Sequence, residues 1–221
     1  MPAPGSQQSP KRCPEPAENA AFIRASAWYN PGMTISDSEN RRNKLLRAAA
    51  RLFQEKGYAA TTVRDIARAV GLQSGSLFYH FRNKEEILVA VMQNGMRRTS
   101  EAATAALEDV TDPAQRLRAL FRAHLQTLLG DLQDDMIVLL YEQRSLPEDA
   151  RSDLVKLRDE YEQVWQQVIA DAVDAGVVRG DPGVVRRFSL GALNWTVQWY
   201  RKDGPLSPTD LADEFLNTIT I

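Results

Sequence analysis

Apolar residues recur every three or four positions along most of the chain, which is the period of helices with one buried face. The first clear example is the stretch KLLRAAARLFQEKGY. It places Leu45, Ala49, Leu52 and Phe53 on one face and ends at Gly57. The pattern predicts an amphipathic helix that ends where glycine can adopt a positive φ angle.

The next stretch, TTVRDIARAVG, predicts a shorter helix with an unusually complete set of boundary signals. Apolar residues stand at i, i+3, i+4 and i+7 from Val63. Thr62 can cap the N-terminus, and Asp65 three residues later is typical of a capping box. Gly71 then allows the chain to leave the helix.

A helix of barely two turns is predicted over residues 74–81, with Leu77 and Phe81 facing inward. A helix that short is not stable alone, so its neighbours must hold it in place. Its other side chains remain available to contact a partner. Two helices joined by a tight turn, with the second short and outward-facing, indicate a helix-turn-helix DNA-reading unit.

The rest of the chain predicts only helices, and neither strand-like alternation nor an internal repeat is present. We expect an all-α fold with a helix-turn-helix domain at residues 34–82 and a larger helical domain at 83–221. Proline-rich residues 1–33 cannot bury a core, and we expect a disordered tail there. The further expected helices span 83–108, 136–145, 149–175 and 181–202, with one begun by Asp112-Pro113 and the last by Ser207-Pro208.

Charge separates the two expected domains, although the formal net charge is only −2. Residues 34–92 carry ten Lys/Arg and six Asp/Glu, whereas residues 93–221 carry fourteen and twenty-one. A basic head on an acidic body suits a DNA-binding part joined to a part that does not touch DNA. Solvated helices could give the same asymmetry, so the charge supports the motif without replacing it.

Several other classes of protein are disfavoured. The single cysteine, Cys13, excludes an intramolecular disulfide and any cysteine-cluster metal site. No apolar run has the length of a membrane span, and we expect a cytoplasmic protein. His80 and His124 are the only histidines, and we find neither a nucleophile motif nor a glycine-rich phosphate loop. We therefore expect no enzyme activity, no cofactor and no metal.

The helix-turn-helix region resembles the TetR family of bacterial transcriptional repressors. The resemblance covers about residues 41–92 and rests on the TTVRDIA run, Gly71, Gly75, Leu77, the FYHF ending at Phe81 and the NKE that opens the next helix. Where the family often has a Ser-Lys pair, this chain has Gln73-Ser74. The helix cap is then expected to shift to Ser74, and a lysine contact to phosphate is missing. The QSGSL variant resembles a subgroup that regulates fatty-acid, phenylacetate or steroid breakdown and responds to acyl-CoA thioesters.

The resemblance implies a set of DNA contacts around the short helix. Tyr79 and His80 are placed to meet the duplex, Gly75 lets the helix backbone approach it, and Lys84 is placed for a phosphate. The alternative is that Tyr79 and His80 only cover the core. The full set of candidate DNA-binding residues is Thr62, Arg64, Gln73, Ser74, Gly75, Ser76, Phe78, Tyr79, His80 and Lys84.

Large or polar side chains on otherwise apolar helical faces indicate an effector cavity in the C-terminal domain. The alternative is a packed core whose polar atoms are satisfied. Cations around the helix at 181–202, such as Arg186 and Arg187, favour an acyl-CoA, because its phosphates need such donors. The alternative is that these cations are simply solvated. The candidate effector-binding residues are Phe121, His124, Met136, Tyr141, Trp165, Asn194, Trp195 and Gln198.

The last two helices supply more aromatic and aliphatic surface than a small helical domain needs. The resemblance implies that they form a homodimer interface, with Trp199, Leu211 and Phe215 as candidates. We expect a repressor that binds a palindromic double-stranded DNA operator and is released by a small-molecule effector. Two alternatives stay open: a family member that senses a drug or free acid and controls an efflux gene, and a DNA-binding protein that needs no ligand.

Overall fold

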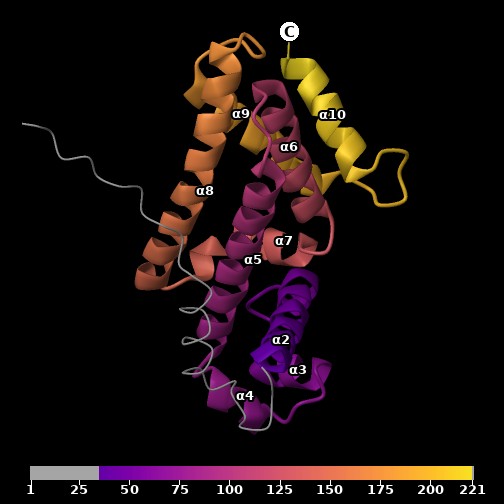
Figure 1. Ribbon diagram of the computed structural model, residues 1–221. Coiled ribbons are helices and arrows are strands. Elements are labelled where there is room, and N and C mark those ends of the chain that lie inside the picture. Colours follow the sequence, from indigo (N-terminus) through magenta and orange to yellow (C-terminus); the bar gives the residue numbers. More distant parts are fainter. Residues whose placement is uncertain (1–34, 221) are drawn as a thin grey trace, which may run out of the picture. The chain divides into compact units, whose positions relative to one another are not determined.

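The computed structural model describes residues 35–220 (Figure 1). Side chains are described from residue 40 onward, except those of Ser74, Ser76, Tyr79 and Asp149. The chain divides into two compact units, residues 1–44 and 45–221, and only a helical stretch from 35 to 44 is described in the first. The expected tail at 1–33 lies outside the described residues. The division at residues 34 and 83 stays a prediction.

The described residues form an all-α fold, as the pattern predicted, and the only β-type contact among them is an isolated bridge between Val178 and Thr220. No helix within this part of the chain combines the length and the apolar character that a membrane crossing requires. The α-helices are α2 (Ile35–Lys56), α3 (Val63–Ala69), α4 (Ser74–His80), α5 (Lys84–Leu107), α6 (Pro113–Leu129), α7 (Gln133–Tyr141), α8 (Glu148–Asp174), α9 (Pro182–Trp195) and α10 (Pro208–Ile219).

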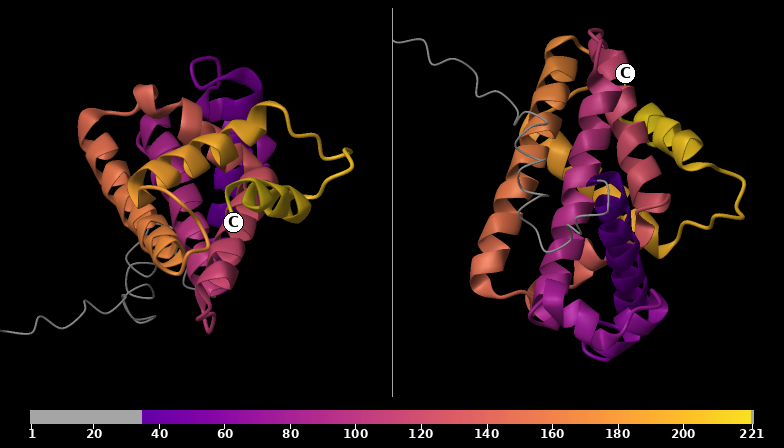
Figure 2. Two further views of the ribbon diagram at one scale, coloured as in Figure 1. Left: turned by 90° about the horizontal axis from the view of Figure 1, so that it is seen from above. Right: turned by 60° about the horizontal axis from the view of Figure 1, so that its bottom comes forward.

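Helix α5 is the centre of the second unit, because it packs against α6, α7 and α8 (Figure 2). Helix α6 in turn packs against α10, and α8 against α9. The core between α6 and α8 is aromatic: Phe121 and Trp165 are almost fully buried, with ring centroids 5.1 Å apart. Burying two such rings contributes several kcal/mol of hydrophobic free energy. These rings anchor α6 against α8.

Helix α9 ends seven residues before the predicted boundary at Lys202. After Trp195 the chain forms a 3₁₀ turn, η2 (Thr196–Gln198). The buried Thr196 hydroxyl donates to the Leu193 carbonyl at 2.6 Å, and its own carbonyl accepts from the Trp199 and Tyr200 amides. The run WTVQWY is rich in β-branched and aromatic residues, which have poor helix propensity. Apolar spacing alone could not reveal this local preference.

Candidate functional site

The helix-turn-helix head (residues 61–81) is built from adjacent parts of the chain. Thr62 caps α3 and forms the predicted capping box with Asp65, whose amide donates to the threonine hydroxyl at 3.1 Å. Gly71 has a φ of 71°, which confirms why glycine stands at this turn. Leu77 of α4 is fully buried and Phe81 nearly so, as predicted. The head thus holds α4 by its inward side chains.

The sequence did not predict one buried contact that stabilises the head, the one made by Thr61. Thr61 is fully buried, and its hydroxyl lies 3.0 Å from the Leu52 carbonyl oxygen and 2.9 Å from that of Gly57. It therefore ties the end of α2 to the start of α3. The sequence shows two consecutive threonines here, but its pattern predicted a role only for Thr62, as the cap of α3. A polar residue directly before an N-cap can serve the preceding helix instead.

The candidate DNA contacts occupy the solvent side of the head. Phe78 is 53% exposed, Gly75 is exposed with open space around its Cα, and His80 is half-buried. Burial lowers the pKa of the His80 imidazole, which favours its neutral form at pH 7. Thr62, Arg64 and Gln73 are exposed. Gln73 occupies the N-cap position of α4, and its side chain makes no capping hydrogen bond, so the prediction that Ser74 is the cap is wrong. The side chains of Ser74, Ser76 and Tyr79 are not among those that the structure describes.

Lys84 has a different environment from the one expected. Its ammonium donates to the Tyr58 carbonyl at 2.6 Å and to the Ala59 carbonyl at 3.2 Å, and lies 4.3 Å from the centre of the Tyr58 ring. These contacts join the first residue of α5 to the end of α2. The cation–π contact and two charged hydrogen bonds stabilise this junction. A phosphate contact from Lys84 stays a prediction.

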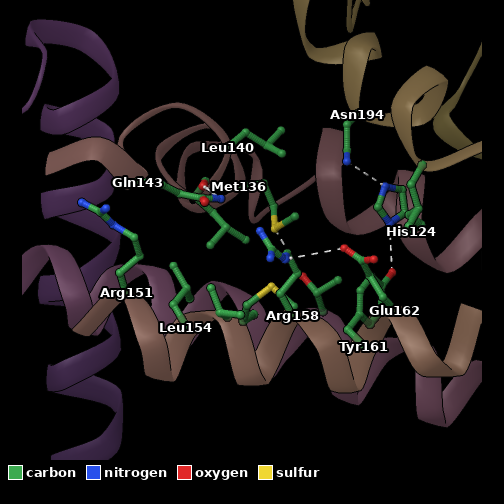
Figure 3. Close-up of a pocket in the computed structure, with 15 residues that line it drawn as sticks. His124, Met136, Leu140, Gln143, Arg151, Leu154, Arg158, Tyr161, Glu162 and Asn194 are labelled. Atoms are coloured by element: carbon green, nitrogen blue, oxygen red, sulfur yellow. Dashed lines mark hydrogen bonds and ion pairs between the residues drawn. The ribbon is translucent and has the colours of Figure 1, made fainter. Parts of the chain in front are cut away.

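A cavity of about 80 Å³ lies among α5, α6, α7, α8 and α9 (Figure 3). One face of α8 forms its longest wall, from Arg151 to Glu162, which is roughly 16 Å at 1.5 Å per residue. Arg151 at one end is exposed, whereas His124 and Tyr161 at the other are buried. The cavity therefore has an open end near Arg151 and a closed end near His124.

Three polar side chains from three helices meet at the closed end. His124 of α6 lies 2.9 Å from the Tyr161 hydroxyl of α8 through Nδ1 and 3.2 Å from the Asn194 Oδ1 of α9 through Nε2 (Figure 3). Burial lowers the pKa of the His124 imidazole to about 4, so the ring is neutral at pH 7. An amide oxygen can only accept, hence Nε2 carries the proton and Nδ1 accepts from Tyr161.

Charged groups line the rest of the wall. Glu162 pairs with Arg186 of α9, and its other oxygen lies 3.6 Å from Arg158 Nε. Arg186 also donates to Gln166 at 3.0 Å. Arg158 Nε is buried and has no hydrogen-bond partner within the described residues. A guanidinium that is only loosely held at a cavity wall can receive an anionic or carbonyl group from a ligand.

The structure brings only part of the predicted effector set to this cavity. His124, Met136 and Asn194 line it. Phe121 and Trp165 lie behind it in the core. Tyr141, Trp195 and Gln198 do not line it: Tyr141 and Trp195 are 49% and 61% exposed, and the Gln198 amide donates to the Tyr141 hydroxyl at 2.6 Å outside. Helix α9 turns Trp195 outward because adjacent residues, here Asn194 and Trp195, point about 100° apart.

Sequence reasoning missed most polar residues of the cavity wall. The charged ones stand on a partly exposed face of α8 that reads as ordinary solvated surface, so the sequence carries no separate signal for them. Tyr161 is buried on α8 and reads as an ordinary core residue of that helix. The missed residues are Thr99, Gln143, Arg151, Arg158, Tyr161 and Glu162.

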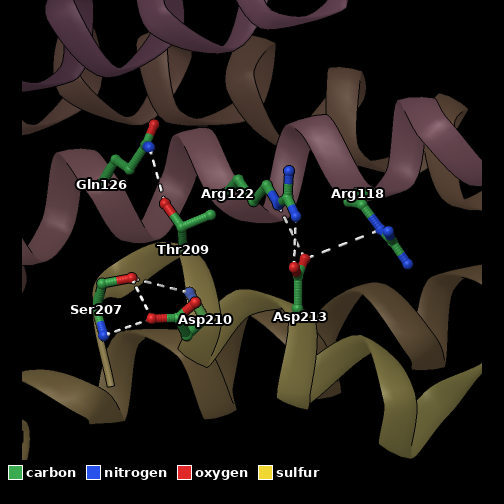
Figure 4. A network of polar contacts seen from close by, with 7 residues as sticks. All are labelled: Arg118, Arg122, Gln126, Ser207, Thr209, Asp210 and Asp213. Carbon is green, nitrogen blue, oxygen red and sulfur yellow. Dashed lines mark hydrogen bonds and ion pairs between the residues drawn. The ribbon is translucent and has the colours of Figure 1, made fainter. Parts of the chain in front are cut away.

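The candidate dimer residues are divided in the same way. Trp199 is 49% exposed, Phe215 is half-buried, and Leu211 is only 5% exposed and packs within the protomer. Leu211 is inward because α10 is fastened to α6: Asp213 accepts from Arg122, and Gln126 donates to Thr209 at 3.0 Å (Figure 4). The largest exposed apolar side chains stand on α9 instead. Val184, Phe188 and Trp195 are 58%, 78% and 61% exposed.

Comparison with known proteins gives matches over both parts of the chain. A family model described as bacterial regulatory proteins of the tetR family matches residues 45–91, and one for the tetracyclin repressor-like C-terminal domain matches residues 110–220. The HTH-type transcriptional repressor KstR2 of Mycolicibacterium smegmatis is 31% identical over 186 residues, which are 83% of this chain and 90% of that one.

Two solved structures extend the comparison. A complex of AibR with isovaleryl coenzyme A and operator DNA has a TM-score of 0.74 and 28% identity, and covers 81% of this chain and 97% of that one. The superantigen PfiT has a TM-score of 0.70 and 46% identity, with 82% and 97% covered. TetR regulators bind operator DNA as dimers. The chain belongs to the TetR family of bacterial transcriptional regulators.

Proposed function

We propose that the protein is a dimeric repressor that leaves its operator when an acyl-CoA occupies the cavity. The observation that carries this proposal is that helix α5 serves both sites. Its first residue, Lys84, is bonded to the end of α2, whereas Met96 and Thr99 line the cavity. The distance along the helix from Lys84 to Met96 is roughly 18 Å at 1.5 Å per residue. A ligand that moves this wall must move or strain α5.

The volume of the cavity supports a two-state mechanism. About 80 Å³ is well below the ~300 Å³ or more that a drug-sized ligand requires. An acyl group needs more room than the described conformation offers, and we expect the helices to separate when it enters. A ligand that fits one state and not the other shifts the equilibrium toward the state that it fits. Separation of α5 and α7 is the expected change, since Gly95 of α5 packs tightly against Asp135 of α7.

The chemistry of the wall favours an acyl-CoA over the alternatives. Arg151 and Arg158 offer cations toward the open end, where an anionic carrier such as coenzyme A would lie. An uncharged drug would make no use of these cations, so the efflux alternative is not favoured. A DNA-binding protein without a ligand has no need of a cavity with a polar closed end. AibR, with its bound isovaleryl coenzyme A, is a structural relative whose ligand fits this choice.

We further propose that two copies pair through the outward face of α9. Val184, Phe188 and Trp195 follow one another at helical spacing on that face, and Trp199 continues beyond it. Such a patch is costly to leave in water and is typical of an interface between protomers. Pairing would place two reading heads on one duplex, as a palindromic operator requires. We also propose that the protein acts in the cytoplasm and has no catalytic role.

Selection of a binding site from random DNA, followed by titration with acyl-CoAs, tests the function. We expect a palindromic site from the full-length protein. Isovaleryl-CoA or octanoyl-CoA should lower its occupancy at concentrations at which coenzyme A and the free acids do not. Occupancy that no thioester changes would contradict the effector proposal. Hydrolysis of the thioester by the purified protein would contradict the absence of a catalytic role.

A further inference from the structure

We propose that Asn194 determines which acyl-CoAs the cavity accepts, and that it selects acyl groups carrying a keto or hydroxyl oxygen near the end remote from the thioester. This inference rests on the proposed function and goes further, since it assigns a specificity-determining residue and a chemical class of effector. The argument begins with the direction in which a ligand lies.

The two ends of the cavity differ in exposure and in charge. Arg151 is exposed and Gln143 is half-buried, whereas Tyr161 and His124 are 6% and 3% exposed. The charged, phosphate-bearing carrier of an acyl-CoA must stay near the cations and the solvent, because burying its charges would cost far more than any local contact returns. The thioester therefore lies toward Arg151, and the far end of the acyl group points to the closed end.

The closed end holds an amide in a fixed orientation. Tyr161 donates to His124 Nδ1, and the protonated His124 Nε2 donates to Asn194 Oδ1. With the amide oxygen toward Nε2, the three residues form one consistent chain of hydrogen bonds. Tyr161 and His124 act here as positioning residues for Asn194.

The other side of that amide has no partner within residues 40–220, whose side chains the structure describes with four exceptions. Among the described residues, Asn194 Nδ2 donates to no acceptor, although Asn194 lines the cavity. In the ligand-free state water can accept from it. An alkyl chain would displace that water without replacing its hydrogen bond, which leaves a desolvated donor and costs affinity. A keto or hydroxyl oxygen at the same place would accept the bond.

The remaining polar groups at the closed end cannot make the same selection. The Tyr161 proton is already given to His124, so the hydroxyl has only an acceptor to offer. Trp165 Nε1 has no hydrogen-bond partner within the described residues, but Trp165 is fully buried and does not line the cavity. Thr99 donates to the Gly95 carbonyl at 2.9 Å. Asn194 is thus a donor at this end that a ligand can reach, while Arg158 Nε, which has no hydrogen-bond partner among the described residues, is a second donor one helical turn from Tyr161 along the wall.

Asn194 is half-buried, and a hydrogen-bonding group that loses its water when a ligand binds disfavours the analogue that cannot pair with it. The test is calorimetry on the full-length protein with hexanoyl-, octanoyl- and decanoyl-CoA. Each is compared with its derivatives that carry a keto or a hydroxyl group on the carbon next to the terminal methyl. At the best chain length we expect the oxygenated ligands to bind at least tenfold more tightly, about 1.4 kcal/mol.

Variants separate recognition from folding. Asn194→Leu should remove the preference for the oxygenated ligands, and Tyr161→Phe should reduce it in part. Asn194→Asp keeps the shape but replaces the donor with an acceptor, so it should remove the preference for the keto ligand and retain that for the hydroxyl ligand. Asn217→Leu is the matched control, because it makes the same substitution on the exposed face of α10. Melting temperatures identify any variant that fails to fold.

The outcomes are distinct for this inference and for the proposed function. Equal affinity for plain and oxygenated ligands at every chain length would overturn the role of Asn194 and leave the acyl-CoA proposal intact. The same follows if the preference survives in both Asn194 variants. Absence of binding by every thioester would refute the proposed function, and this inference would fall with it.

Discussion

The helix-turn-helix head and the effector cavity are assembled in opposite ways. The head is made from about twenty consecutive residues, and its determining contacts, such as Thr62 with Asp65, join positions three apart. The cavity takes its closed end from residues separated by 37 and 70 positions, in His124 with Tyr161 and with Asn194. Local chemistry therefore determines the head, whereas the packing of whole helices determines the cavity.

The largest expected effect concerns the surface that joins two copies of the body. Phe188→Asp would place a charge at the most exposed apolar side chain of α9, 78% exposed in the protomer. If that face is the interface, burying an unpaired charge should weaken dimerisation by about 3–5 kcal/mol and reduce operator affinity with it. Sedimentation should show monomers. Asn217→Asp adds the same charge to α10 and should leave the dimer unchanged; dissociation by that variant instead would move the interface to α10.

The head can be tested at its buried anchor. Leu77→Ala removes a fully buried side chain from α4, and cavity formation should cost about 2–5 kcal/mol. Because the damage is local, operator binding should be lost while acyl-CoA binding is retained. Calorimetry and gel-shift assays on one preparation measure both. Leu72→Ala, at a 41% exposed position, is the control. Parallel loss of both activities would show that the head and body do not respond separately.

Two buried groups of the body should respond to pH in opposite directions. Burial raises the pKa of the Asp135 carboxyl to about 6 from 3.8, so the unfolded chain loses this proton first and stability falls as pH rises from 4 to 6. Burial lowers the pKa of His124 to about 4 from 6.5, so the unfolded chain binds this proton first and stability falls as pH drops from 6.5 to 4. Each response amounts to up to about 3 kcal/mol at 1.36 kcal/mol per pKa unit.

These opposing responses should largely cancel between pH 4 and 6, and substitutions should uncover them. Asp135→Asn is expected to lose stability on acidification more steeply than the parent, because the His124 response is then unopposed. His124→Gln is expected to lose less. Urea unfolding of the three proteins at pH 4.5 and 7.5 gives the comparison. Identical pH dependence in all three would mean that neither group is held as the structure indicates.

Lys84 offers a smaller but sharper test, because two roles predict different observables. Lys84→Met removes the bonds to the Tyr58 and Ala59 carbonyls, at an expected cost of about 1–3 kcal/mol in unfolding free energy. If Lys84 only ties the head to α5, the salt dependence of operator binding should stay as it is. If it also contacts a phosphate, the slope of log K against log salt should fall by about one unit. An unchanged melting temperature would exclude the tying role.

The smallest effect should come from the cap of α3. Thr62→Ala removes the side-chain acceptor for the Asp65 amide and should cost about 1 kcal/mol, whereas Thr62→Ser keeps the acceptor and should cost much less. Thermal unfolding distinguishes them. Equal effects from both substitutions would indicate that the methyl group of Thr62, and not its oxygen, stabilises the head.

The difference between head and body also sets what the sequence could predict. Caps at Thr62 and Asp112, the positive φ of Gly71 and the buried Leu77 were all predictable, because each depends on neighbours within a few positions. Tyr141 and Trp195 were assigned to the cavity although they lie outside it. Apolar spacing shows that a helix has a buried face, but it does not show which helix that face meets. Arg158 and Glu162 gave no signal, since a charged side chain reads the same on a cavity wall and in solvent.

The small volume of the cavity has a consequence for the time course of regulation. A ligand that needs more room than the cavity offers must wait for the helices to part, so the opening rate limits how fast the effector can associate. The same closure slows the ligand's departure. Brief rises in effector concentration would then leave operator occupancy unchanged, and a protein that has bound effector would stay off the operator after the effector concentration falls. Its response records the recent history of the metabolite more than its momentary level.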